Sequence, residues 1–105
     1  MDELLTALAA TKIPFAEYAW DQRPDPPYGV VSLEGSDDTV AGDGRIIHQS
    51  LRGSIDLFVA GSSLDAMQAV QDAINGIVAW RLNSIQLEED TRLVHYEWIY
   101  EMELM

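Results

Sequence analysis

The C-terminal segment constrains the fold most, because its side chains alternate between two classes. From Leu93 to Leu104, aromatic and apolar side chains take turns with more polar ones. This period of two residues is typical of a strand with one buried face, since successive side chains of a strand point to opposite sides of the sheet. The predicted buried face holds Val94, Tyr96, Trp98, Tyr100 and Met102. The chain is therefore expected to contain a sheet with one covered face and one solvated face.

Other segments show weaker strand patterns. Strands are predicted at 13–20, 28–33, 45–49, 51–60 and 85–89, where 45–49 and 51–60 form either one strand or two. Gly53 is a candidate bulge. The segment 34–45 is rich in Gly, Asp and Ser and lies between predicted strands. It is therefore expected to be a long hairpin tip.

Two segments have helical periodicity. Residues 2–11 place Leu4 and Leu8 on one face and carry acidic residues at the start, which suits a helix N-terminus. Residues 62–80 carry apolar side chains at helical spacing after two serines that can cap a helix. Gly76 either allows close packing of this second helix on the sheet or marks its end.

The order of these elements predicts an α+β fold. The expected order is α-β-β-β-β-α-β-β, with both helices on one face of an antiparallel or mixed sheet. A length of 105 residues fits a single domain, 1–105. A chain of this size buries only a thin core, so association with other copies would add stability.

The sequence carries no recognisable catalytic or metal-binding pattern. It has no cysteine, and neither His48 nor His95 has further ligands at the spacing of a zinc motif. The acidic segment 37–44 lacks the ligand pattern of an EF-hand, and the sequence shows no phosphate-binding loop followed by a helix. We therefore predict that the protein is not an enzyme and has no resident metal or cofactor.

The charge of the chain argues against conventional nucleic-acid binding. It has 18 acidic and 6 basic residues, for a formal net charge of −12. Such a surface repels phosphate groups, so specific binding of DNA or RNA is not expected. The charge either maintains solubility or lines a passage through which DNA slides without adhering. Because no stretch approaches the length of an apolar membrane span, a membrane partner is not expected either.

An ordered set of short segments resembles the small tail proteins of long-tailed bacteriophages. The set consists of Ile13-Pro14-Phe15, Pro26 to Val31, Glu34 to Asp38 with the following Gly-Asp-Gly turn, Ile55 to Phe58, and Leu93 to Trp98. The resemblance covers nearly the whole chain and is to the tail-terminator, tail-completion and head–tail joining proteins. It does not separate a terminator from a joining protein or from a tube protein, because these share related folds.

This resemblance implies a non-enzymatic virion protein, located in the tail or neck and assembled in the host cytoplasm. Copies would form a ring, expected to be hexameric, at the head-proximal end of the tail. The ring would contact the tail-tube protein and the head connector, and DNA would pass through it. Residues expected to take part in these contacts are Asp37, Asp38, Asp43, Arg45, Trp80, Glu97 and Glu101.

Two other classes of function remain open from the sequence. One is a small cytoplasmic adaptor or regulatory domain that acts as a monomer or dimer, for which a single compact apolar patch is expected. The other is an enzyme subunit whose site forms only at an interface, for which a pocket gathering His48 or His95 with carboxylates is expected.

Overall fold

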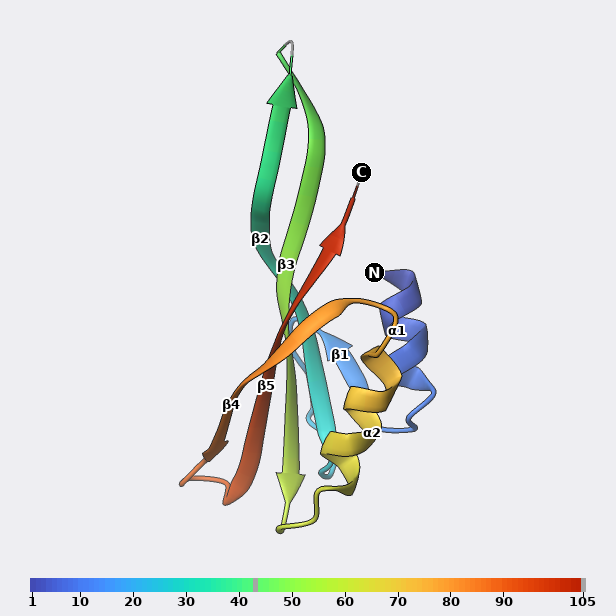
Figure 1. Cartoon of the computed structure of the whole chain (residues 1–105). Helices are drawn as coiled ribbons and strands as arrows, with labels where there is room; N and C mark the ends of the chain where they lie inside the picture. Colours follow the sequence, from blue (N-terminus) through green and yellow to red (C-terminus); the bar gives the residue numbers. More distant parts are fainter. Residues whose placement is uncertain (43, 105) are drawn as a thin grey trace.

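The computed structural model describes residues 1–42 and 44–104, except for the side chains of 37–42 and 46–48. It has an α+β fold, which confirms the predicted class (Figure 1). The elements are α1 (Asp2–Ala9), β1 (Phe15–Glu17), β2 (Tyr28–Gly42), β3 (Arg45–Ala60), α2 (Asp65–Ile74), β4 (Ala79–Leu87) and β5 (Leu93–Glu103). Three strands precede the second helix, in place of the four in the predicted order, because 45–49 and 51–60 belong to one strand.

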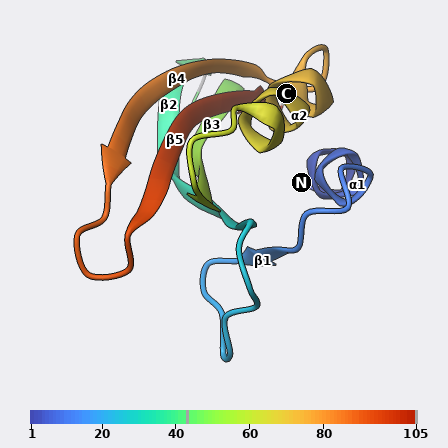
Figure 2. The same ribbon diagram turned by 90° about the horizontal axis from the view of Figure 1, so that it is seen from below.

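All five strands form one mixed sheet in the order β1-β2-β3-β5-β4. β1 runs parallel to β2, and every other neighbouring pair is antiparallel. The two helices lie beside each other on one face, and the sheet curves around them (Figure 2). We call this the helix-side face and the opposite one the outer face.

The core lies between the helices and the helix-side face of β2, β3 and β5. Trp98 and Tyr100 of β5 are fully buried, and Tyr96 is nearly so. The predicted buried face of the last strand is therefore confirmed at its centre. Leu4 and Leu8 of α1 and Val70 and Ile74 of α2 cover these side chains. The alternation in the sequence reflects this coverage directly, because the helices lie over only one face of β5.

The segment 34–45 lies at the tip of the β2–β3 hairpin, as predicted, but most of it belongs to the strands and not to a loop. β2 continues to Gly42 and pairs with β3, which begins at Arg45. β5 ends at Glu103, opposite Ser50, so the two strands extend further as a two-stranded ribbon (Figure 1). A strand that no helix or sheet covers need not alternate apolar and polar residues, so its sequence looks like a loop. We call the ribbon formed by residues 37–42 and 45–49 the arm.

The predicted helix at 62–80 is too long, and the predicted strand at 85–89 is too short. α2 ends at Ile74, and Gly76 has φ +81°, a left-handed conformation that glycine adopts without strain. Ile77 and Val78 follow this turn and still pack against the core, so the apolar pattern continues after the helix has ended. β4 then begins at Ala79, which places Trp80 in a strand.

Two smaller predictions also need correction. The predicted strand at 13–20 is reduced to Phe15–Glu17, because Tyr18 has φ 67° and leaves the extended conformation. The predicted bulge at Gly53 lies instead on the partner strand, where Glu34 is the extra residue between the pairs Leu33–Gly53 and Gly35–Arg52. Glycine at position 53 allows close packing, because Tyr100 and the Ser32 carbonyl occupy the space that a Cβ atom would fill.

Candidate interaction surfaces

β1 and β4 are the two edge strands of the sheet, and β4 carries exposed apolar side chains. Leu82, Ile85 and Leu87 are 37%, 55% and 50% exposed. They are paired with Trp98, Tyr96 and Val94 of β5, so they lie on the helix-side face. β4 bends away from both helices, which leaves this face of the strand uncovered (Figure 2). We call Leu82, Ile85 and Leu87 the β4 strip.

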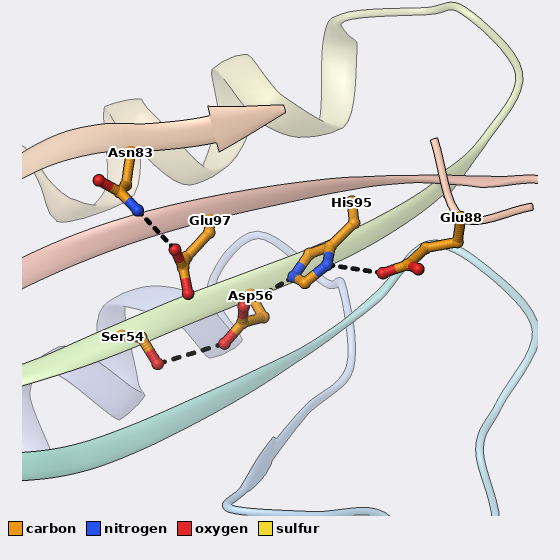
Figure 3. A network of polar contacts seen from close by, with 6 residues as sticks. All are labelled: Ser54, Asp56, Asn83, Glu88, His95 and Glu97. Atoms are coloured by element: carbon orange, nitrogen blue, oxygen red, sulfur yellow. Dashed lines mark hydrogen bonds and ion pairs between the residues drawn. The ribbon is translucent and has the colours of Figure 1, made fainter. Parts of the chain in front are cut away.

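A bulge at Asn83 puts all three side chains of the strip on one face. The register of β4 against β5 shifts between Leu82 and Ser84, so Leu82 and Ile85 point the same way although they are three residues apart. The Asn83 side chain accepts a hydrogen bond from Arg81 at 2.7 Å. It donates one to Glu97 at 2.7 Å (Figure 3). The bulge is therefore held by side-chain contacts as well as by the backbone.

The opposite end of the sheet has an apolar groove between α1 and β1. The groove has a volume of about 520 Å³ and is lined by Leu5, Ala9, Lys12, Ile13, Pro14, Phe15 and Glu17. Five of these seven side chains are apolar. Lys12 is exposed and has φ 68°, at the turn that follows α1. We call this feature the α1–β1 groove.

His95 links three parts of the sheet on the outer face (Figure 3). Its Nε2 atom lies 2.7 Å from Asp56 Oδ1 on β3, and its Nδ1 atom lies 2.8 Å from Glu88 Oε1 in the turn after β4. Only the imidazolium form has an N–H on both nitrogens and can donate both bonds. The bond with Asp56, followed by the bond with Glu88, raises the pKa of His95 above its ordinary value of 6.5, against the opposing effect of partial burial.

An aromatic row on the outer face supports the His95 ring. Phe58 stacks on His95 with ring centroids 4.3 Å apart, and Tyr28 stacks on Phe58 at 5.1 Å. Trp20 meets Tyr28 edge-on, and its indole N–H donates to the Gly29 carbonyl at 2.9 Å. The row fixes the loop before β2 to the sheet. Phe58 also covers one face of the imidazole ring. The arrangement is therefore suited to stabilising the packing of the strands.

The His95 cluster has no geometry for holding a metal ion. The carboxylates of Asp56 and Glu88 contact opposite nitrogens of the ring and cannot meet on one cation. Over the described residues, no group of three or more His, Asp or Glu side chains could hold a metal ion.

The structure places six of the seven predicted interaction residues, three on the arm and three on the neighbouring strands β4 and β5. Asp37 and Asp38 lie on the arm, but their side chains are outside the described part, as is the whole of Asp43. Arg45 is exposed at the start of β3. Their roles in contacts remain predictions.

The other three predicted residues lie on β4 and β5. Trp80 is half-buried against the core, and its indole N–H donates to Asn75 Oδ1 at 3.0 Å. Glu97 and Glu101 lie on the outer face of β5, where Glu97 accepts the bond from Asn83. Trp80 and Glu101 both line a shallow hollow at the β4 edge.

Sequence reasoning missed the β4 strip and the α1–β1 groove. The strip has a signal, since Trp80 and Leu82 alternate, as do Ile85 and Leu87. The bulge at Asn83 interrupts the period between the two pairs and hides a single strand. The groove has no such signal, because it forms from two elements that meet only in the folded chain.

The chain matches no protein-family model, and no curated protein shows significant sequence similarity to it. Of the helices in the described residues, none has the length and apolar character needed to cross a bilayer. The function is therefore inferred from the surfaces described above and from the resemblance carried by the short segments of the sequence.

Proposed function

We propose that this protein is a structural subunit of a ring at the head-proximal end of a long-tailed phage tail. The ring ends growth of the tail tube and joins the tail to the head connector. The proposal rests on the resemblance of the ordered segments to tail-completion and tail-terminator proteins. Three further features support it: the sheet edges, the arm and the net charge.

The structural observation that best supports a ring is that the two sheet edges differ. One edge is the long β4 with its apolar strip, and the other is the short β1 beside an apolar groove. A contact between two different surfaces of identical chains is heterologous, and repeated contacts of this kind close into a ring when the rotation allows it. A closed ring covers every sheet edge, whereas an isolated copy leaves both edges open to aggregation.

The arm suits contact with a neighbouring component of the tail. The molecule measures 53 Å along its long axis but only 26 and 25 Å across. A two-stranded ribbon buries little apolar surface by itself. An arm that projects from the body is therefore well placed to gain contacts with the adjacent ring of the tube. A net charge of −12 lets DNA pass with little adhesion.

The proposal is tested by measuring assembly and tail length. Purified protein is expected to form a discrete multi-subunit species in light scattering and rings in negative-stain images. Phage lacking the protein should make tails of irregular length that do not join heads, and supplying the protein should restore both. A monomer at every concentration, together with its absence from purified tails, would refute the proposal. A stable dimer with neither tail defect would favour the adaptor function.

A further inference from the structure

We propose that the β4 strip of one copy docks in the α1–β1 groove of the next copy, with β4 pairing alongside β1. This contact would continue the sheet from one subunit to the next. The inference rests on the proposed ring and specifies the surfaces that form it. The partner is a second copy of this chain.

The two surfaces are complementary in character and lie on the same side of the sheet. Ile85 and Leu87 are about half exposed, because α1 and α2 cover other strands. The groove is lined by α1 and β1, so it too lies on the helix side. When β4 is added beside a neighbour's β1, the strip faces the neighbour's α1. That helix then covers the strip as each subunit's own helices cover β5.

Strand direction favours this pairing. β1 and β2 are parallel, and three antiparallel steps lead from β2 through β3 and β5 to β4. β1 and β4 therefore run in opposite directions. In a sheet that continues from copy to copy, β4 meets the neighbouring β1 in antiparallel orientation, which is the commoner and slightly more stable kind of strand pair.

The register across the sheet brings matching side chains to the same level. Phe15 pairs with Gly29, which pairs with Leu57 on β3. Leu57 pairs with Tyr96, which pairs with Ile85 on β4. Phe15 and Ile85 thus occupy one row on the helix-side face, at opposite edges of the sheet. A neighbour added at the same height would place Ile85 beside Phe15, within the groove.

The one basic residue that lines the groove agrees with this register. Lys12 lies three residues before β1, so antiparallel pairing with Ile85 beside Phe15 would bring it level with the end of the neighbour's β4. The turn after β4 carries the exposed residues Glu89 and Asp90. Glu17 also lines the groove, but it pairs with Val31 and lies further along β1, in the row of Leu82. Lys12 would therefore face the acidic turn in a chain where acidic residues outnumber basic ones by 18 to 6.

The contact is tested by cross-linking, for which the absence of cysteine in the chain provides a clean background. Ala9→Cys and Ile85→Cys are introduced together, and the protein is treated with a short bismaleimide. The matched control replaces Ile85→Cys by Gln86→Cys, which is adjacent and exposed but on the outer face. We expect a ladder of covalent oligomers for the first pair and much less for the control. A mixture of the two single variants Ala9→Cys and Ile85→Cys should give only covalent dimers.

A second measurement uses Ile85→Asp, with Gln86→Asp as its control. Burial of a charge in the groove should weaken each contact at least about tenfold and shift the assembly toward monomer, while the control stays assembled. Circular dichroism of both variants checks that the subunit remains folded. A wild-type ring that shows neither the cross-link nor sensitivity at Ile85 would overturn this contact and leave the proposed function standing. Wild-type protein that never assembles and is also absent from purified tails would overturn both.

Discussion

The two hydrogen bonds of His95, to Asp56 and Glu88, can be tested on the protein alone, without a binding partner. Replacing His95→Gln removes the positive charge between Asp56 and Glu88 but keeps a side chain that can form hydrogen bonds. The substitution also removes the ring that stacks on Phe58. We expect the variant to be less stable than the wild type at pH 6.

The size of the loss follows from the exposure of the three side chains. His95 and Asp56 are 22% and 17% exposed, and a hydrogen bond to a charged group contributes roughly 1.5–3 kcal/mol when it is shielded. Glu88 is 43% exposed, and an ion pair with a solvated partner contributes roughly 0–1 kcal/mol. Because neither contact is fully buried, we expect a total loss of about 2 kcal/mol, toward the lower end of that sum.

The dependence on pH has a definite sign. The folded pKa of His95 is raised above 6.5, so the stabilisation is fully present below pH 6.5 and is lost as the pH rises through the folded pKa. Above that pKa the neutral ring has one N–H for two carboxylates. The difference between wild type and His95→Gln should therefore be largest near pH 6 and shrink by pH 9.

The assay is urea unfolding followed by tryptophan fluorescence at pH 6 and pH 9. Protein concentration is held fixed, because association adds to apparent stability. His48→Gln serves as the control for loss of a histidine. If the stabilities of wild type and His95→Gln change in parallel between the two pH values, the hydrogen bonds from a charged His95 to Asp56 and Glu88 do not form in solution.

Two further predictions concern the core beside β5. In Gly53→Ala the new Cβ atom would overlap the Ser32 carbonyl oxygen and lie 2.6 Å from the Tyr100 ring. We expect a loss of about 3 kcal/mol, seen as a lower urea midpoint, and a midpoint like that of the wild type would contradict the packing. Tyr100→Phe removes the bond that Tyr100 donates to Ser32 at 3.1 Å and should reduce stability by about 1 kcal/mol at pH 8. Burial raises the pKa of Tyr100 to about 12, so the wild type should lose stability between pH 10 and 12 to a greater extent than Tyr100→Phe, and equal losses in thermal unfolding would count against a buried phenol.

The parts of the fold that the sequence predicts are those where one face is covered and the other is not. The last strand shows this best, because Tyr96, Trp98 and Tyr100 alternate with residues that face water. The prediction of the first helix at 2–11 ends within two residues of its observed end for the same reason. Prediction from the local pattern fails where the secondary structure changes but the spacing of apolar residues does not. Ile77 and Val78 continue the apolar stripe of the second helix although Gly76 has already ended it.

The candidate surfaces were harder to predict than the fold, because they depend on register. His95, Asp56 and Glu88 meet only because β3, β5 and the turn after β4 are aligned as they are. Nothing in their sequence spacing indicates this contact. The arm is predicted only in part, as a hairpin tip without strands, for a different reason. Apart from the bond that Leu104 N donates to the Gln49 carbonyl, the described residues of the arm show strand pairing between β2 and β3 alone, so the sequence there needs no apolar alternation.

The edges of this sheet suggest why assembly would suit the chain. Edge strands in natural sheets are commonly protected by charge, proline, bulges or short length. β1 has only three residues, which is protection of this kind. β4 has nine residues, carries a bulge at Asn83, and has Arg81 as its single charged residue. Its protection is therefore incomplete, and its apolar strip remains exposed. A net charge of −12 opposes unspecific association of copies, which favours a contact with matched apolar surfaces over weaker ones. A closed ring would meet both requirements, since it covers each β4 once and leaves no edge on which a further copy can add.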